Sequence, residues 1–359
     1  MTLKELYNDI IKSPETWSYY KPLRQSGTNS WPPIYIHNIF EDNNCEQFIK
    51  DYFGEGGKGI LIEGLIVNLS NIRKIHTVSC FFLGIQIAKS LFVTKKRKWR
   101  PSFCYYWFLS SLYHDFGYQF EENITLSEEL PTNEVYDKIK IPTELEPYFS
   151  KEVIEHYSEY RNRQLGDKYD HGITGGKLLY DKFDENFKHY RQDESNPNKF
   201  TKIINGRELL FNKKQYDYIA EAALAIMLHN IWFCNEGCPN YCDKDKYTGD
   251  LRSLVDKKVS FSYSASLYFL LLIADTIEPT KRIINSIPDL NDTVEKVLNY
   301  ISISFEEANI IISYDSELIN LDNFEFGKWK DNILFMDKWM NITTEEEDMS
   351  IKMHILVPN

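Results

Sequence analysis

The most constraining feature of this sequence is a set of metal-competent side chains embedded in apolar, helix-like segments. Its members are His76, His114, Asp115, His171, His229 and Asp275. Buried imidazole and carboxylate groups must be paired or bind a metal to offset their loss of water. Any one of them could be a core residue whose polar atoms form hydrogen bonds within the protein. Six separate sets of hydrogen-bond partners are harder to provide than one shared site. The sequence therefore predicts a fold that gathers distant helices around a common polar centre.

The apolar residues near these side chains repeat with helical spacing. From Ile72 to Leu91 they recur about every 3.6 residues, and Phe103 to His114 continue at intervals of three and four. Further helices are predicted over Leu3–Ile11, from Asp170 onward, and over Tyr216–Asn230, Phe261–Ile277 and Val294–Ala308. All six metal-competent residues fall on predicted helices, and the chain is expected to be mainly α.

The composition and periodicity of the residues along the sequence predict three regions. Residues 1–70 read as an N-terminal helical and loop extension, 71–285 as a helical domain that holds the six residues, and 286–359 as a helix with a small β element. The β element is indicated by alternation of period 2 around Ile351–Val357. Polar stretches near 119–168, 190–212 and 234–259 are predicted as insertions in the helical domain, the second being a loop or small hairpin.

Composition and charge limit the kinds of molecule that this protein is expected to bind. The formal net charge of −12 opposes binding of long nucleic acid. The longest apolar run, Leu267–Ala274, is too short to span a membrane, and the N-terminal residues lack the apolar core of a leader peptide. The six cysteines show no disulfide framework. These features predict a cytoplasmic protein without a membrane partner, whose anionic ligand would need a local source of positive charge.

The order H…HD…H…H…D and its flanking residues resemble the HD-domain metal-dependent phosphohydrolases. The segments that carry the resemblance are RKIHTVSCFFLGIQIA, HGITGG, AIMLHN and ADTIEPTKR. The last of these is similar to a segment of bacterial HD-type hydrolases of diadenosine tetraphosphate. The resemblance covers Ile72 to Arg282 with gaps. The chain departs from the pattern at Tyr118, where many HD domains have lysine.

The resemblance implies an HD-domain helical bundle with insertions and a dinuclear metal centre. One ion would be held by His76, His114, Asp115 and Asp275, and the other by Asp115, His171 and His229, with Asp115 bridging. Two divalent transition metals are implied, Fe or Mn first, with Zn, Co, Ni or Mg as alternatives. His114 and Asp115 would also be catalytic, because they hold the metal-bound hydroxide that attacks phosphorus.

The expected substrate is a small anionic nucleotide with a phosphoester or phosphoanhydride bond, and a dinucleoside polyphosphate is the first choice. A cyclic or oligonucleotide phosphodiesterase or nuclease is the alternative of the same chemistry. A nucleotide-sensing regulatory module with little catalysis is the alternative from another class. Whether the protein forms oligomers is left open by the sequence.

Several charged residues have both a functional and a structural interpretation. Arg282 is the preferred phosphate clamp, ahead of its neighbour Lys281, and Arg73 is expected to pair with a carboxylate or with substrate. Asp170 could orient an imidazole or cap a helix, and capping is preferred. The basic run 95–100 could steer anions, but a solvated loop is preferred.

Glycines, cysteines and the remaining histidines carry weaker signals. Gly172, Gly175 and Gly176 would admit either a ligand or a second helix close to the backbone. Free thiols are preferred to a metal site at Cys234, Cys238 and Cys242, because the C-x3-C-x3-C spacing is not that of structural zinc. The histidines predicted as structural or surface residues are His37, His156, His189 and His354.

Overall fold

The computed structural model describes residues 1–11, 71–94, 106–122, 134–164, 169–188, 190–204, 207–230, 258–262, 266–284 and 290–357, apart from positions 108, 112, 144 and 148. Within these ranges the protein is mainly helical, as predicted. Among the described helices, none combines the length and apolarity needed to cross a membrane. The basic run 95–100, the three cysteines from 234 to 242, His37 and His189 lie outside the described residues.

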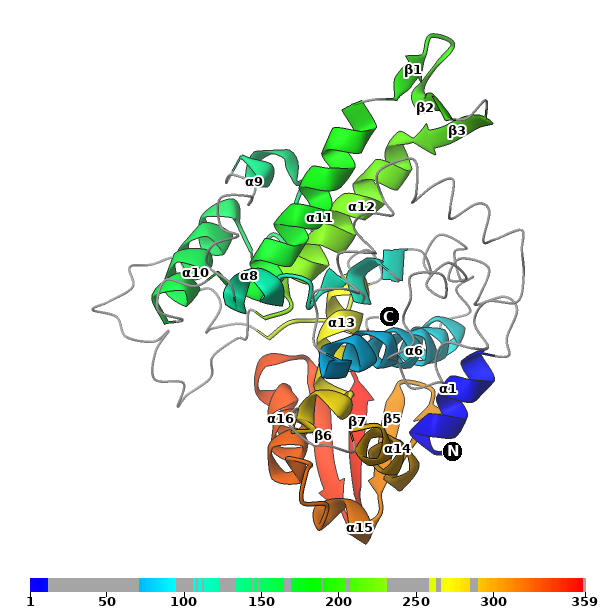
Figure 1. Cartoon of the computed structure of the whole chain (residues 1–359), viewed down its shortest axis with the longest axis vertical. Helices are drawn as coiled ribbons and strands as arrows, with labels where there is room; N and C mark the ends of the chain where they lie inside the picture. Colours follow the sequence, from blue (N-terminus) through cyan, green and yellow to red (C-terminus); the bar gives the residue numbers. More distant parts are fainter. Residues whose placement is uncertain are drawn as a thin grey trace.

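The described helices and strands follow one another in a fixed order (Figure 1). The helices are α1 (Leu3–Ile11), α6 (Asn71–Thr94), α8 (Tyr118–Glu122), α9 (Val135–Lys138), α10 (Lys151–Gln164), α11 (His171–Lys188), α12 (Lys213–Leu228), α13 (Ser266–Ile277), the 3-10 turn η5 (Thr280–Arg282), α14 (Leu290–Tyr300), α15 (Ser316–Ile319) and α16 (Phe326–Trp339). The strands are β1 (Arg191–Asp193), β2 (Asn196–Ile204), β3 (Arg207–Asn212), β4 (Ile301–Glu306), β5 (Asn309–Tyr314), β6 (Ile342–Glu347) and β7 (Ser350–Ile355).

Helices α6 and α13 pack against each other in the centre of the molecule. Both consist almost entirely of buried residues over their described positions, which is typical of helices enclosed on all sides. Beside them lies the helical stretch around Trp107, a fully buried residue whose Nε1–H donates to Phe81 O at 2.8 Å. Gly84 leaves the space for this indole, since a Cβ there would lie 1.9 Å from the Trp107 ring. Helix α6 is therefore packed closely against the stretch around Trp107.

Helices α11 and α12 lie along each other and carry the three-stranded sheet β1–β2–β3 beyond their ends (Figure 1). Ala223 of α12 lies against Gly176 of α11, where a Cβ would lie 2.4 Å from Ala223 O, so Gly176 allows close packing of the two helices. A Cβ at Gly172 would lie 2.9 Å from the His229 ring, and one at Gly175 would lie 3.0 Å from Tyr113 O. The small hairpin predicted over 190–212 is present, as an antiparallel three-stranded sheet.

The C-terminal residues form a second, four-stranded antiparallel sheet of order β4–β5–β7–β6, with α14 and α16 packed beside it. The single helix predicted over Val294–Ala308 is wrong in its second half. Helix α14 ends at Tyr300, and the following ISISFE is strand β4, paired with β5 from Ile301 to Glu306. Its isoleucines alternate with serines, so strand pairing buries one face and overrides the weak helical pattern.

Three contacts, one from a side chain and two between backbones, join residues 324–329 to the segment from Ile277 to Ile283. Trp329 Nε1–H donates to Ile277 O at 3.0 Å, and the Glu325 N–H donates to Arg282 O at 3.0 Å. Ile283 forms an antiparallel bridge with Phe324. The segment from Ile277 to Ile283 is consequently fixed from outside the helical domain, and this segment carries several residues of the site described below.

Candidate metal centre

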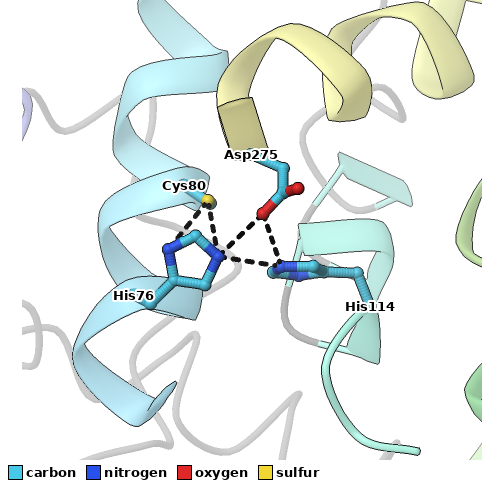
Figure 2. Close-up of side chains that lie close together, drawn as sticks. All are labelled: His76, Cys80, His114 and Asp275. Carbon is cyan, nitrogen blue, oxygen red and sulfur yellow. Dashed lines mark hydrogen bonds and ion pairs between the residues drawn. The ribbon is translucent and has the colours of Figure 1, made fainter. Parts of the chain in front are cut away.

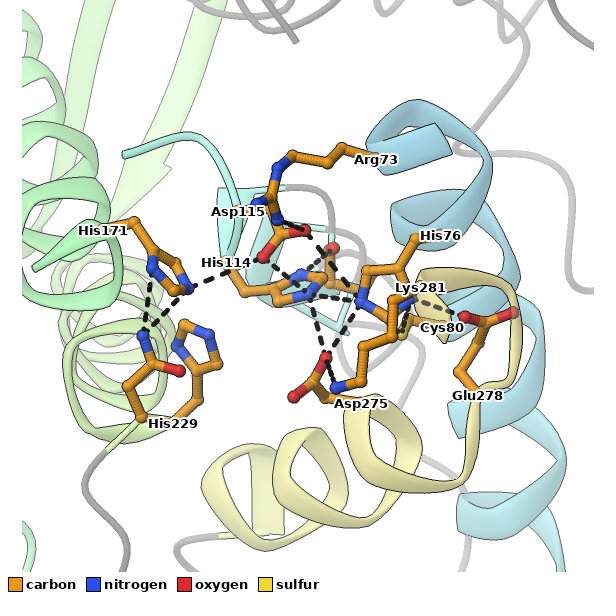
Figure 3. A network of polar contacts seen from close by, with 12 residues as sticks. Arg73, His76, Cys80, His114, Asp115, His171, His229, Asp275, Glu278 and Lys281 are labelled. Atoms are coloured by element: carbon orange, nitrogen blue, oxygen red, sulfur yellow. Dashed lines mark hydrogen bonds and ion pairs between the residues drawn. The ribbon is translucent and has the colours of Figure 1, made fainter. Parts of the chain in front are cut away.

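Five segments place the six predicted residues around one buried point (Figure 3). His76 comes from within α6 and Asp275 from within α13, as predicted. His171 is the first residue of α11, and Asp170 before it accepts the Ile173 N–H at 3.0 Å, which confirms its role as helix cap. Five of the six residues are buried, and the Asp275 side chain is 13% exposed.

Three of the six are not on helices, contrary to the prediction. His114 and Asp115 lie in a turn of residues 114–117, and His229 lies in a turn directly after α12. Residues just after a helix are not confined to helical backbone geometry. The last carbonyl groups of the helix have no partner within it and can accept other hydrogen bonds. Both histidines use this: Nδ1 of His114 lies 2.6 Å from Ser111 O, and Nδ1 of His229 lies 2.6 Å from Ile226 O.

The first half of the centre consists of His76, His114 and Asp275 (Figure 2). His76 Nε2 lies 2.9 Å from Asp275 Oδ1 and 3.2 Å from His114 Nε2, while His114 Nε2 lies 3.5 Å from Asp275 Oδ1. Two ligand atoms bound about 2.1 Å from the same ion are separated by about 3.0 to 3.4 Å at ordinary coordination angles. The observed separations fit one shared divalent ion.

Asp115 connects this half with a second one. Its Oδ1 lies 3.4 Å from His114 Nε2 and 3.7 Å from His171 Nε2, and its Oδ2 lies 4.0 Å from His76 Nε2. The ring of His229 stands edge-on to both His114 and His171, with centroids 5.1 Å and 5.3 Å away. Asp115 is thus the residue that faces imidazoles on both sides, which is the position of a bridging carboxylate.

Every one of the four histidines has its Nδ1 against a protein acceptor. His76 Nδ1 lies 2.5 Å from Glu278 Oε2, and His171 Nδ1 lies 2.9 Å from Glu121 Oε2. The other two use the backbone carbonyls named above. Because carbonyl and carboxylate oxygens only accept, Nδ1 of each histidine donates to its acceptor. His76 Nε2 also faces a carboxylate oxygen, Asp275 Oδ1, so His76 can donate from both ring nitrogens. Donation from Nδ1 to a protein acceptor is usual for metal-binding histidines, and the buried His and Asp groups could hold a metal ion.

Electrostatics keep the two carboxylates ionised, favour the neutral form of His229 and favour the charged form of His76. Burial lowers the pKa of His76, but Cys80 and the hydrogen bonds to Asp275 and Glu278 raise it well above its usual value. Burial alone would raise the pKa of Asp115, but His114, His76 and Arg73 hold it well below the usual range. Burial opposes ionisation of Asp275 too, yet Lys281 and the hydrogen bonds to His114 and His76 lower its pKa. Burial, together with repulsion from His114 and His171, lowers the pKa of His229 to about 3. Anionic oxygen and neutral imidazole are the forms that bind metals.

Sequence reasoning missed the residues that orient the histidines. Glu278 is fully buried, and its Oε2 also accepts the Thr280 N–H at 3.0 Å and the Thr280 hydroxyl at 2.8 Å. A glutamate between Ile277 and Pro279, three residues after a metal-competent aspartate, was the available signal. Glu121 had no such signal, since it stands in an acidic stretch that reads as an insertion. Asn230 Nδ2 lies 2.8 Å from His171 Nε2.

Cys80 belongs to the wall of the centre rather than to its ligands. Its Sγ is 3.7 Å from His76 Nδ1 and 3.6 Å from His76 Nε2, and it donates to Ala274 O. An atom that shared an ion with Nε2 would be clearly nearer to Nε2 than to Nδ1. Because the two distances are nearly equal, the sulfur lies against the imidazole ring and not beside Nε2. Burial also raises the pKa of the thiol to about 12.

Arg73, Tyr118 and His171 form a stack at the edge of the centre. The Tyr118 ring lies parallel to the His171 imidazole with centroids 3.5 Å apart, and the Arg73 guanidinium carbon lies 3.0 Å from the Tyr118 centroid. Arg73 Nη1 also lies 3.5 Å from Asp115 Oδ2, which bears out the expected pairing of Arg73 with a carboxylate. Tyr118 therefore holds an arginine beside the centre.

Among the described residues Lys281, and not the preferred Arg282, forms an ion pair with one of the six, Asp275. Lys281 Nζ lies 2.7 Å from Asp275 Oδ1. The Arg282 Nε is a buried atom without a hydrogen-bond partner in the part of the chain that the structure describes. In a 3-10 turn, successive side chains point in directions about 120° apart, so neighbours cannot face the same point. The role of Arg282 as a phosphate clamp stays a prediction.

The chain has no match among known proteins in three comparisons: no family model, no curated protein and no solved structure is similar enough to count as one.

Replacing Glu278 by glutamine tests whether the contact with His76 supports metal binding. Loss of the negative charge should weaken Mn²⁺ binding by roughly ten- to hundredfold, the range for groups that orient a metal ligand. Isothermal titration on the intact protein measures this. The exposed Glu345→Gln on β6 is the control and should bind as the parent does. Equal affinity in Glu278→Gln would contradict the orienting role.

Proposed function

We propose that this protein is a dinuclear-metal phosphohydrolase that acts on a soluble nucleotide. One observation carries the proposal: four buried histidines each place Nδ1 on a protein acceptor, and Nε2 of His76, His114 and His171 lies 2.9 to 4.0 Å from oxygens of Asp115 and Asp275. The second ring nitrogens of three histidines, His76, His114 and His171, thus face the same two aspartates, and His114 Nε2 also lies 3.2 Å from His76 Nε2.

His76, His114, Asp115 and Asp275 would hold one divalent ion, and Asp115, His171 and His229 the other. Imidazole with carboxylate suits Fe or Mn, with Zn, Co, Ni and Mg as alternatives. Two such ions would supply an activated water and neutralise charge that develops on a phosphoryl group. The protein supplies the placement of Asp115 between the two halves, with its Oδ1 facing both His114 and His171.

Arg73 is the residue best placed to bind the substrate phosphate. Its side chain is 29% exposed while Asp115 is 5% exposed, so the guanidinium lies between the buried carboxylate and solvent. Stacking on Tyr118 limits its freedom, so less entropy is lost when it binds an anion. The resemblance to diadenosine tetraphosphate hydrolases makes a dinucleoside polyphosphate the first substrate to test, ahead of cyclic or oligonucleotide phosphodiesters.

A metal analysis joined to a substrate screen tests the proposal. Purified protein should contain about two transition-metal ions per chain. With Mn, Fe, Co or Mg it should release product from at least one member of a panel of dinucleoside polyphosphates, cyclic dinucleotides, nucleoside mono- and triphosphates and short oligonucleotides. Protein that binds metal and nucleotide without turnover would favour a nucleotide-sensing module. Protein that binds no metal would refute the proposal.

A further inference from the structure

A lysine lies against the carboxylate oxygen that also faces two metal-competent histidines. Asp275 Oδ1 is 2.7 Å from Lys281 Nζ, 2.9 Å from His76 Nε2 and 3.5 Å from His114 Nε2. Figure 3 shows Lys281 reaching back from the segment after α13 to Asp275, in front of His76. An ion held by this oxygen and the two Nε2 atoms would be a close neighbour of the ammonium group. Like charges at such separations repel strongly when partly shielded from water.

The backbone beneath Lys281 is fixed, whereas its side chain is partly exposed to water. Residues on both sides of it are held by the Trp329 contact with Ile277 and by the Glu325 contact with Arg282. The Lys281 side chain is 21% exposed and that of Asp275 is 13% exposed. A four-carbon stem on a fixed backbone can move its ammonium group by a short distance without unfolding the segment.

The second cation near the centre is held differently. Arg73 Nη1 approaches Asp115 only to 3.5 Å, and its guanidinium is packed on the Tyr118 ring. Lys281 has the shorter contact and, through its flexible stem, the greater freedom to exchange partners. The two cations therefore flank the centre at different carboxylates, one stacked in place and one able to move.

We propose that Lys281 is an exchangeable counter-cation of the centre, which neutralises Asp275 until a metal ion takes that oxygen and then binds a phosphate oxygen of the substrate. The inference rests on the proposed metal-dependent function. Its physical basis is competition: the ammonium and the metal ion share Asp275 Oδ1, so each weakens the other's binding. A bound phosphate restores an anionic partner for the lysine, so phosphate binding is coupled to metal binding.

The test measures binding and needs no turnover. Mn²⁺ alone is titrated into the full chain, and inorganic phosphate is then titrated into the Mn²⁺-saturated protein. For Lys281→Gln we expect roughly three- to tenfold tighter Mn²⁺ binding, about the worth of a partly exposed ion pair, and at least roughly tenfold weaker phosphate binding. Lys281→Arg keeps the charge and should bind Mn²⁺ as the parent does. Lys296→Gln, which removes an exposed lysine paired with Asp292 on α14, is the matched control without effect.

Each remaining outcome decides between alternatives. Weaker Mn²⁺ binding by Lys281→Gln would overturn the inference, because the lysine would then only hold Asp275 in position. Phosphate binding lost in Arg282→Gln and kept in Lys281→Gln would overturn it in favour of the neighbouring arginine. If the parent protein binds no Mn²⁺ or other transition metal, the proposed function itself fails. If the parent binds Mn²⁺ and Lys281→Gln binds it equally well, only the present inference fails.

Discussion

Substitution of Asp115 by asparagine should abolish both metal binding at the second half of the centre and hydrolysis. Asp115 is the carboxylate that faces His114 and His171 together, and an amide binds transition metals far more weakly than a carboxylate. Loss of an orienting partner costs up to about 100-fold in affinity or activity, so loss of the bridging ligand should exceed that. Metal content by mass spectrometry and product release under the conditions of the parent protein measure the two effects.

A fold check separates this result from simple unfolding. Asparagine has nearly the volume of aspartate, so the far-ultraviolet circular dichroism of Asp115→Asn should match that of the parent. Added Mn²⁺ should raise the melting temperature of the parent protein, because an ion that binds only the folded state stabilises it. The variant should show little of this rise. A folded Asp115→Asn protein that keeps two metals and full activity would be incompatible with Asp115 as the bridge.

Replacement of Gly117 by alanine should disrupt the centre although Gly117 contributes no ligand. A Cβ at this position would lie 1.9 Å from His171 O and within 2.7 Å of the His171 carbonyl carbon and Cα. All three are backbone atoms, so the 114–117 turn and the first turn of α11 must separate. That movement would pull Asp115 away from His171. We expect a loss of about 1 to 3 kcal/mol in the free energy of unfolding, as for overpacked sites, together with weakened metal binding.

The matched control is Gly327→Ala in α16, where no atom lies within 4 Å of the added methyl group. Alanine is the better helix former, so Gly327→Ala should be neutral or slightly stabilising. Urea denaturation gives the free energies of both variants, and Mn²⁺ titration gives their affinities. Native metal affinity in Gly117→Ala would mean that the contact between the turn and α11 does not set the distance between Asp115 and His171.

The candidate ligand set was accessible from sequence because burial imposes a rule on each member separately. A histidine within AIMLHN or an aspartate within LLLIADTI is surrounded by apolar residues, so the cost of burying it is visible without knowledge of its partner. The structure brings all six of these residues together. The residues that orient them were less visible, since Glu121 acquires its importance only by lying beside His171, fifty positions further along the chain.

Helix boundaries and contacts between residues also divide into features that a segment's own sequence predicts and features that other segments decide. The helices α1 and α6 were predicted from the spacing of apolar residues and α12 from its alanine-rich sequence, and both signals depend on each segment's own residues. The change from α14 to β4 at Ile301 was not predicted, because pairing with β5 decides it. Similarly, Lys281 and Arg282 are equivalent as sequence neighbours, and only the turn η5, fixed by contacts from Phe324 to Trp329, turns one of them toward Asp275.

By itself, then, the sequence determined a mainly helical protein with six buried, metal-competent side chains, because hydrophobic spacing and the cost of burying polar groups act locally. Only the tertiary structure decided which glutamates and backbone carbonyl groups face the Nδ1 atoms of the histidines, and which cation lies at Asp275. Those features depend on distances between segments that are far apart in the chain, such as the 202 positions between His76 and Glu278. Such distances are set by packing.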